Sequence, residues 1–299
     1  MRILMSGASG LIGSALSSHL STDCHTVTRL VRRDAREGEH TWDPATASLD
    51  PAAFDGCDAV INLSGANIGD KRWTDQYKSE LLSSRLQTTA LLATTMAGLD
   101  TKPSVFISGS AIGWYGDRGD ERLDELSPAG TDFLSNLCQQ WEAATVPAED
   151  AGIRTVHVRT GIVLSAQGGA LKKQLPLFKL GLGGRFGNGH QWQSWISIND
   201  EVGAITHLLT TDICGAVNIT APNPVTNSEF TTTLAKVLHR PAVLPIPSFG
   251  PKMLFGGEMV DALLLSGQRV SPTALQRSGY EFLHETLDVA LRDLLHRPS

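Results

Sequence analysis

The chain has 299 residues, of which 41% are hydrophobic and 19% charged, and its formal net charge at pH 7 is −6. This composition is typical of a soluble globular protein with a large core, and the acidic balance without a long basic run argues against nucleic acid as a partner. No stretch approaches the roughly 20 apolar residues of a membrane-spanning helix, and the first predicted strand begins too early for a signal peptide, so we expect a cytoplasmic protein with no membrane partner.

The cysteines lie far apart in the sequence, at Cys24, Cys57, Cys138 and Cys214, and no two of them form a Cys-x-x-Cys pair. This spacing predicts neither a disulfide framework nor a zinc site. We therefore expect reduced cysteines that pack as small side chains, and no metal.

A glycine-rich turn follows the first predicted strand, residues 2–6. It reads Gly7-Ala8-Ser9-Gly10-Leu11-Ile12-Gly13 and leads into apolar residues at helical spacing. Glycine permits strained dihedral angles there and lets backbone N–H groups approach a diphosphate at the start of the helix. The predicted cofactor-binding residues in this segment are Gly7, Ser9, Gly10, Leu11, Ile12 and Gly13. An α/β protein that binds phosphate but no dinucleotide is a less favoured interpretation of the same turn.

Two arginines end the second predicted strand, residues 25–31. A site selective for NAD usually has Asp or Glu at this position to bind the ribose 2′-hydroxyl, whereas Arg32 and Arg33 suit a 2′-phosphate. The sequence therefore favours NADP (NADPH) over NAD. The alternative is that both arginines are solvated loop charges, and Asp34 follows them directly.

Further strand-like runs at 58–63, 104–108 and 154–160 alternate with predicted helices over 75–96 and 132–151. This pattern predicts an α/β fold, a Rossmann-type doubly wound parallel sheet with helices on both faces. The glycine-dense segment 165–200 is expected to supply substrate loops, with a strand at 196–198 and a helix capped by Asn199 or Asp200 and running to residue 209. A proline-rich segment, 241–251, precedes predicted short helices at 258–265 and 286–295.

Serine hydroxyls lie at the end of the 104–108 strand, where ligands bind in open α/β sheets. Ser110 could hydrogen-bond a substrate oxygen, and Tyr115 could add a second donor, so these two are the candidate catalytic residues. The alternative is that the serines only end the strand and shape a turn.

These motifs resemble those of the extended short-chain dehydrogenase/reductases, which include the nucleotide-sugar epimerases. The resemblance rests on the Gly7 to Gly13 turn, on residues 58–65 and on Ser108-Gly109-Ser110 with Tyr115-Gly116. Further segments are similar to one atypical branch, the epimerase-family proteins: Trp73, Ser84-Arg85, Trp141-Glu142, 159–164, 181–184 and 189–196. Members of that branch carry a short C-terminal module of unknown role, which residues 248–295 resemble.

The resemblance implies further cofactor-binding positions. It implies that Arg32 and Arg33 hold the 2′-phosphate, that Leu63 and Ser64 line the adenosine and phosphate path, and that Val163 lies near the nicotinamide. Glu80 and Arg85 match polar residues that face the cofactor in this branch. Their spacing of five residues does not put them on one helical stripe, so a solvated role is equally compatible with the sequence.

One family feature is missing. Ordinary short-chain dehydrogenases use Tyr-x-x-x-Lys, in which the lysine lowers the pKa of the tyrosine. Here the residues four positions after Tyr77, Tyr115 and Tyr280 are Leu81, Gly119 and His284. Tyr115 could replace the dyad, His190 could do so, or no proton transfer occurs.

The sequence therefore predicts a Rossmann domain of epimerase type over residues 1–240, a substrate-side C-terminal helical module over 248–296, and possible homodimers. The expected function is that of an NADP(H)-binding oxidoreductase or epimerase of atypical mechanism, acting on a small hydroxylated or carbonyl substrate. The alternative function, motivated by the missing dyad, is a non-catalytic NADP(H)-binding sensor or regulatory protein.

Overall fold

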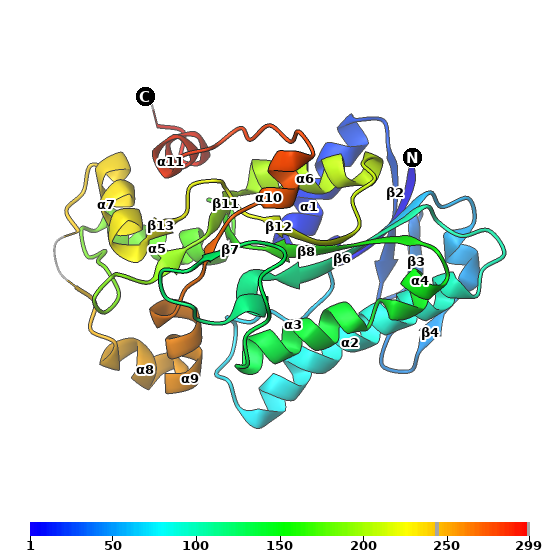
Figure 1. Cartoon of the computed structure of the whole chain (residues 1–299), viewed down its shortest axis with the longest axis horizontal. Helices are drawn as coiled ribbons and strands as arrows, with labels where there is room; N and C mark the ends of the chain where they lie inside the picture. Colours follow the sequence, from blue (N-terminus) through cyan, green and yellow to red (C-terminus); the bar gives the residue numbers. More distant parts are fainter. Residues whose placement is uncertain (243–244, 298–299) are drawn as a thin grey trace.

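The computed structural model describes residues 1–242 and 245–297, which are arranged around one central sheet (Figure 1). Its strand order is β12-β8-β6-β5-β1-β2-β3-β4, and every neighbouring pair is parallel except β3 and β4. The strands are β1 (Arg2–Ser6), β2 (Thr26–Val31), β3 (Glu39–Asp43), β4 (Ser48–Leu49), β5 (Ala59–Asn62), β6 (Val105–Ala111), β8 (Arg154–Thr160) and β12 (Gly215–Ile219). The predicted doubly wound, largely parallel sheet is confirmed.

Helices cover both faces of this sheet (Figure 1). One face is covered by α1 (Leu11–Thr22) and α6 (Ile198–Thr210), and the other by α2 (Asp75–Ala97), α3 (Phe133–Ala143) and α4 (Val146–Asp150). Alternate residues of β1 enter two different hydrophobic clusters. Ile3 and Met5 pack with Leu16 of α1, whereas Leu4 packs with Met96 of α2. Burial on both faces explains why residues 3–5 of β1 are a continuous apolar run.

The strand order reverses beside β1. From β1 the chain builds the sheet outward through β2 and β3, and it then returns to the other side of β1 to add β5, β6, β8 and β12. In open α/β sheets, ligands bind at the carboxyl ends of the strands where the order reverses. The glycine turn after β1 and the residues after β5 therefore meet at the expected place for a ligand.

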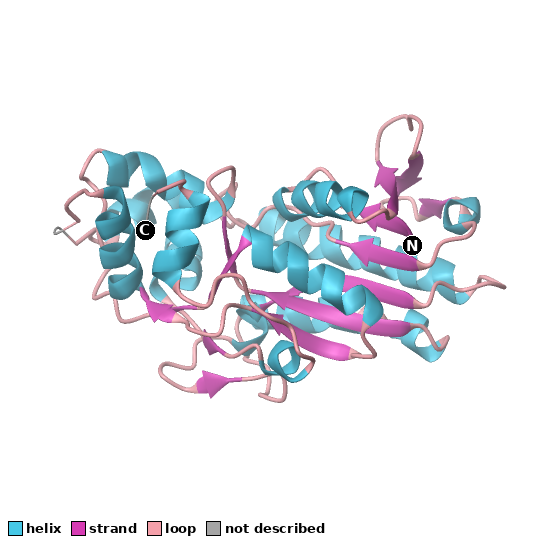
Figure 2. Ribbon diagram, turned by 90° about the horizontal axis from the view of Figure 1, so that it is seen from above, coloured by secondary structure: helices cyan, strands magenta, loops and turns pink. Residues whose placement is uncertain are grey.

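A group of helices lies beyond the carboxyl ends of the strands (Figure 2). It contains α5 (Gly169–Lys179), α7 (Asn227–Leu238) and α11 (Leu287–Leu294), which share a hydrophobic cluster. Small two-stranded sheets join it to the central sheet: β9 (Ile162–Leu164) with β11 (Trp195–Ser197), β10 (Trp192–Gln193) with β13 (Val225–Thr226), and β7 (Arg122–Leu123) with β14 (Arg269–Val270). The remaining elements are α8 (Phe249–Phe255), α9 (Gly257–Val260), α10 (Thr273–Arg277), and the short helices η1 (Pro51–Phe54), η2 (Ile112–Tyr115) and η3 (Asp261–Leu265).

The C-terminal segment packs into the rest of the molecule. Leu275 of α10 belongs to the cluster under β1, and Leu291 of α11 belongs to the cluster of α5 and α7. None of the hydrophobic clusters found in the described part of the chain consists of residues 248–296 alone. The division at residue 240 stays a prediction, and these residues complete cores that begin elsewhere.

Two predicted boundaries differ from the structure. The helix expected over 132–151 is interrupted at Ala144 and Thr145, because Pro147 opens a new helix, α4, and proline has no N–H for a continuing helical hydrogen bond. The helix α6 is capped by Ser197, whose Oγ accepts from the Asp200 N–H at 3.0 Å, and not by Asn199 or Asp200.

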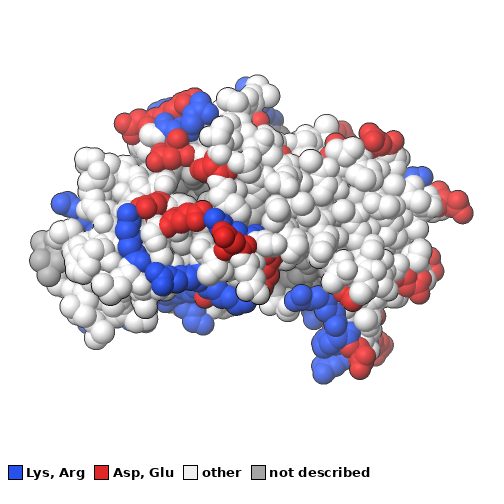
Figure 3. All heavy atoms as spheres, turned by 90° about the horizontal axis from the view of Figure 1, so that it is seen from below, with Lys and Arg blue, Asp and Glu red and all other residues white. Residues whose placement is uncertain are grey.

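Surface charge is mixed on the face shown in Figure 3, where basic and acidic side chains lie next to one another around a hollow. Within the described residues, no helix combines the length and the apolar character needed to cross a membrane.

Candidate functional site

The glycine turn has no room for side chains at two positions. Gly7 has φ +73°, and a Cβ on Gly13 would lie 2.2 Å from the Gly7 carbonyl oxygen. The turn is closed by the Gly10 N–H, which donates to the Gly7 carbonyl at 3.0 Å. Ser9 and Gly10 are exposed, so the backbone at the start of α1 is open to a ligand. Leu11 and Ile12 are half-buried and begin the helix that leads away from the turn.

The turn touches the residues that follow β5. A Cβ on Gly7 would lie 2.5 Å from the Leu63 carbonyl carbon and 2.8 Å from the Ser64 nitrogen. The Leu63 N–H donates to the Ser6 carbonyl at 3.2 Å, which holds the two strand ends together. The structure thus brings the predicted residues Gly7, Leu63 and Ser64 to one point at the strand-order reversal.

A buried cluster of polar side chains lies next to the contact between the turn and the residues after β5. Asn62 accepts from the Ser6 hydroxyl at 2.6 Å and from the Ser64 N–H at 3.2 Å, and its amide donates to Thr89 Oγ1 at 2.8 Å. Trp141 Nε1 also donates to Thr89 Oγ1, at 3.0 Å. Because all these groups are satisfied within the protein, the carboxyl ends of β1 and β5 are held in fixed positions.

The two arginines after β2 are both exposed but differ in their partners. Arg33 makes a bidentate ion pair with Glu39, both N–O distances being 2.7 Å. Arg32 forms no ion pair or hydrogen bond with any described residue. A phosphate would therefore find Arg32 available, whereas Arg33 would have to share its guanidinium with Glu39.

The two polar residues of α2 lie in different environments. Glu80 is exposed and pairs with Lys71 at 3.2 Å. Arg85 is half-buried: its Nη1 donates to the Leu81 carbonyl at 2.9 Å, and its guanidinium lies 5.0 Å from the Trp141 ring centroid. Burial lowers the pKa of Arg85, and its Nε has no hydrogen-bond partner among the described residues. Burying a cation without a carboxylate partner costs free energy, and an anionic or polar ligand bound beside Arg85 would offset that cost.

Val163 lies on β9, which pairs with β11 beside the carboxyl end of the main sheet. The backbone after it approaches the glycine turn, because a Cβ on Gly168 would lie 2.8 Å from Leu11 Cδ1. From the other side, Lys173 of α5 donates to the Gly69 carbonyl at 3.1 Å. Segments after β5 and after β9 therefore both contact the region of the turn.

Ser110 and Tyr115 belong to a buried network rather than to an open surface. The Ser110 hydroxyl donates to Glu142 Oε1 at 2.6 Å, and Arg159 binds both oxygens of Glu142 at 2.8 and 2.9 Å. Tyr115 donates to Asn218 Oδ1 at 2.7 Å and accepts from Arg159 Nη1 at 3.1 Å. The side chain of Tyr115 is 0% exposed.

Burial raises the pKa of Tyr115 to about 12, so its phenol is protonated near neutral pH. His190, the other residue considered as a replacement for the missing dyad, is exposed in the glycine-rich loop. On α3, Leu137 and Cys138 are buried in an apolar cluster, and burial raises the pKa of the Cys138 thiol to about 12. The geometry therefore favours a structural role for Tyr115, and the ionisable side chain that α3 brings to Ser110 is Glu142, which is paired with Arg159.

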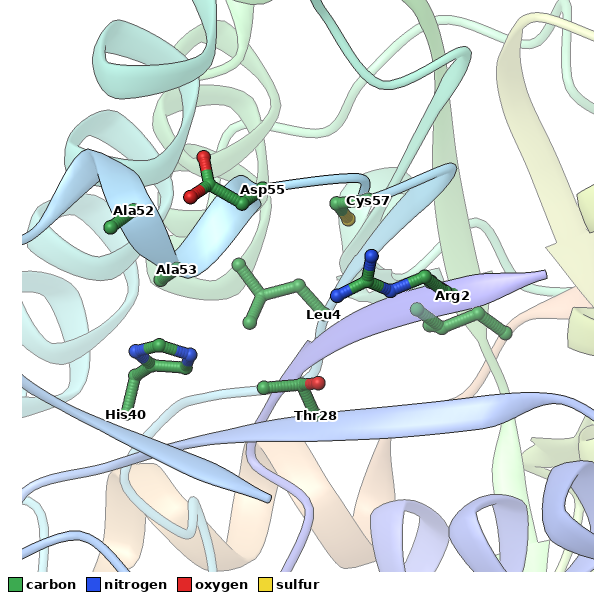
Figure 4. A pocket seen from close by; sticks show the side chains of 9 residues that line it. Arg2, Leu4, Thr28, His40, Ala52, Ala53, Asp55 and Cys57 are labelled. Atoms are coloured by element: carbon green, nitrogen blue, oxygen red, sulfur yellow. The ribbon is translucent and has the colours of Figure 1, made fainter. Parts of the chain in front are cut away.

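A separate small cavity lies at the opposite edge of the sheet, beside the amino end of β1 (Figure 4). Its volume is about 60 Å³, which suits a few water molecules and not a dinucleotide. Side chains of Arg2, Thr28, His40, Asp55 and Cys57 are among those that surround it. The cavity lies away from the glycine turn, and we assign it no part in cofactor binding.

Comparison with known proteins shows the family of this chain. Residues 3–220 match the NAD dependent epimerase/dehydratase family, and residues 246–294 match a domain of unknown function (DUF1731). The chain belongs to the NAD dependent epimerase/dehydratase family. An epimerase family protein of Mycobacterium bovis is 45% identical over 99% of this chain and 98% of its own length. The predicted resemblance is confirmed.

Solved structures of family members are also similar. The human epimerase family protein SDR39U1, crystallised with NADPH, superposes with a TM-score of 0.91 at 38% identity, covering 99% of both chains. A nucleoside-diphosphate sugar epimerase from Corynebacterium glutamicum gives a TM-score of 0.81 at 36% identity, covering 99% of this chain and 59% of its own.

Three residues of the buried networks were not predicted as site residues. Glu142 and Arg159 stand out in the sequence only through the family resemblance, and their ion pair joins α3 to β8 across the intervening helix α4. Glu201 is completely buried at the start of α6, where its Oε1 accepts from Thr160 Oγ1 at 2.8 Å. The available signal for Glu201 is an acidic residue in the first turn of the helix that follows β11.

Proposed function

We propose that this protein binds NADP(H) along the carboxyl edge of the sheet and is an oxidoreductase or epimerase of atypical mechanism. The observation that carries the proposal is the glycine turn, which only glycine can form at Gly13 and which packs on the Leu63–Ser64 backbone. The human relative crystallised with NADPH supports it. The residues present fit the cofactor, because the turn leaves exposed backbone at a helix start and Arg32, at the end of β2, has no ion-pair partner among the described residues.

In this proposal each end of the cofactor has its own partners. Residues of the turn, 7–13, hold the diphosphate, Arg32 binds the 2′-phosphate with Arg33 beside it, and Leu63 and Ser64 line the path between the two strands. Arg85 and Glu80 face the cofactor from α2, and Val163 lies near the nicotinamide. When bound, the nicotinamide supplies or accepts a hydride.

Ser110 would then act as an acceptor toward the substrate. The Ser110 hydroxyl already donates its hydrogen to Glu142. Its oxygen can therefore accept a hydrogen bond from a hydroxyl group of the substrate. This favours a hydroxylated substrate over a carbonyl compound at that position. The Tyr115 phenol, fully buried and bound to Asn218, keeps its proton and positions Arg159.

The cofactor assignment is tested by titrating NADPH and NADH into the wild-type protein and into Arg32→Ala/Arg33→Ala, following nucleotide fluorescence. We expect the double variant to lose NADPH affinity by at least about tenfold while NADH affinity changes little, because only NADPH carries the 2′-phosphate. Equal loss for both nucleotides would remove the assignment.

Catalysis is tested separately by following NADPH absorbance with panels of alcohols, carbonyl compounds and sugar nucleotides. Turnover of a hydroxylated substrate that falls strongly in Ser110→Ala, with NADPH affinity unchanged, is the expected result. Tight NADPH binding without turnover of any candidate would weigh against an enzyme.

A non-catalytic NADP(H)-binding sensor is the second candidate. It is favoured by one observation: Tyr115, the nearest phenol to Ser110 in the sequence, is fully buried and hydrogen-bonded within the protein. In that case NADPH stabilises the fold by mass action and changes the affinity for a partner. Pull-down of the same partner with and without NADPH would distinguish it, and turnover dependent on Tyr115 or His190 would contradict it.

A further inference from the structure

Two arginines lie side by side on the short sheet formed by β7 and β14. Arg122 and Arg269 are partners in the parallel register, and neighbouring strands lie about 4.8 Å apart. The next pair, Leu123 and Val270, is 1% exposed at both residues and packs with Ile112. Because side chains alternate along a strand, the two arginines point to the opposite, solvent-accessible side.

The acidic residues next to this pair are engaged elsewhere. Glu121 accepts from Arg118 Nε and Nη2, both at 2.9 Å, and Asp120 Oδ1 accepts from Trp192 Nε1 at 2.7 Å. In the described part of the chain, neither Arg122 nor Arg269 has a carboxylate within ion-pair distance. Two like charges directly opposite each other on a sheet repel. An anion that binds between them would reduce this repulsion and stabilise the arrangement.

One arginine of the pair is held in place. The Arg269 guanidinium lies 4.2 Å from the Trp192 ring centroid, and the indole is itself fixed by its hydrogen bond to Asp120. Stacking on an aromatic ring leaves the N–H groups at the edge of the guanidinium free to bind an oxyanion.

The pair also lies beside the proposed substrate side of the site. Ser194 links β14 to β9: its hydroxyl donates to the Gln268 carbonyl at 2.7 Å and accepts from the Val270 N–H at 2.9 Å, and its carbonyl accepts from the Ile162 N–H at 2.8 Å. On the other side, Leu123 and Val270 pack with η2, which directly follows the strand that carries Ser110. The β7–β14 sheet therefore lies between the strand of Val163 and the turn after Ser110, and the two arginines extend from its other face, where Arg269 stacks on Trp192.

We propose that Arg122 and Arg269 form an oxyanion subsite that binds a phosphate or carboxylate group of the substrate. The substrate class is then a small hydroxylated compound that carries an anionic group. This inference rests on the proposed function for its place in a substrate site, but the anion binding itself is read at the two arginines and needs no turnover.

The experiment titrates inorganic phosphate and, separately, malonate into the full-length protein at constant ionic strength. Backbone amide shifts of Arg122 and Arg269 in ¹H–¹⁵N spectra report binding, and saturating NADPH keeps the probes from the glycine turn. We expect saturable shifts at both residues and at least about tenfold weaker binding in Arg122→Gln/Arg269→Gln, read from the same signals at positions 122 and 269. Arg277→Gln, which changes an exposed arginine of α10, is the matched control and should bind as the wild type does.

Phosphate binding alone indicates a phosphorylated substrate, and malonate binding alone indicates a carboxylate, and either supports the subsite. No saturable shift with either probe, or wild-type affinity in the double variant, would overturn it. NADPH titration of the same proteins separates the two proposals. A wild-type protein that fails to bind NADPH but still binds an anion at these arginines contradicts the proposed function and keeps the subsite.

Discussion

A Cβ atom on Gly13 would lie 2.2 Å from the carbonyl oxygen of Gly7, and both groups belong to the backbone of the turn. Neither can move aside without opening the turn, so we expect Gly13→Ala to weaken NADPH binding by at least about tenfold. Gly98→Ala is the control, because Gly98 is exposed and lies outside the site, and the nearest atom to a Cβ there lies 3.6 Å away. Fluorescence titration measures affinity, and circular dichroism checks that both variants are folded. Equal affinities in the two variants would contradict the role of the turn.

Single substitutions of the β2 arginines should have unequal effects. Arg33 is already held by Glu39 in a bidentate pair, whereas Arg32 has no partner among the described residues. We expect Arg32→Ala to cost more NADPH affinity than Arg33→Ala, by about threefold or more, since the unpaired guanidinium has no ion pair to give up. NADPH titrations of both variants decide this, and a larger loss in Arg33→Ala would reverse the assignment.

The buried pair between Glu142 and Arg159 should be important for stability. Their side chains are 8% and 4% exposed, and removing one partner leaves the other charge buried. We expect Glu142→Leu to lower the free energy of unfolding by about 3–5 kcal/mol. The exposed pair of Arg118 and Glu121 provides the control, where Glu121→Gln should change it by less than about 1 kcal/mol. Urea denaturation measures both, and a loss below about 1 kcal/mol in Glu142→Leu would contradict the prediction.

Glu201 should make stability depend on pH. Complete burial raises its pKa from 4.5 to about 8, so the folded state binds a proton that the unfolded state releases. Stability from this residue is fully present below about pH 4.5 and is lost as pH rises toward 8, with a limiting slope of about 1.4 kcal/mol per pH unit.

Glu201→Gln mimics the protonated carboxyl at every pH. The difference in unfolding free energy between wild type and variant, measured from pH 5 to 9, should therefore grow in favour of the variant. Other titrating groups cancel in this difference. A constant difference across the range would show that Glu201 does not titrate there.

Much of the central sheet follows from local sequence pattern. The strands β1, β5 and the first half of β6 are buried on both faces, so they are apolar runs that stand out from the helices between them. The strands β3 and β12 were not predicted. The first, Glu39–Asp43, is polar and near the sheet edge, and the second, Gly215–Ile219, is short and pairs with β8. Tertiary pairing, and not local pattern, places such strands in a sheet.

Some features of the candidate site also follow from local sequence, whereas others depend on contacts between elements. The glycine turn is predictable because its backbone geometry demands a residue type, and the structure brings Gly7 against Leu63 and Ser64 as the strand order implies. Other features depend on which side chains meet across elements. They are the pairing of Arg33 with Glu39, the burial of Tyr115 and an Arg85 Nε that has no partner among the described residues. No motif in the sequence carries that information.

The positions of residues 269–291 in the fold also affect when the chain can fold during synthesis. β7 at Arg122–Leu123 pairs with β14 at Arg269–Val270, and Leu291 fills a cluster begun by α5. A nascent chain in which residues 269–291 have not yet been made lacks both partners, so neither contact can form before that segment has been synthesised. The domain of unknown function, residues 246–294, thus completes the fold. A premature stop before it would release a chain that lacks the strand paired with β7 and the residues that α11 adds to the cluster of α5 and α7.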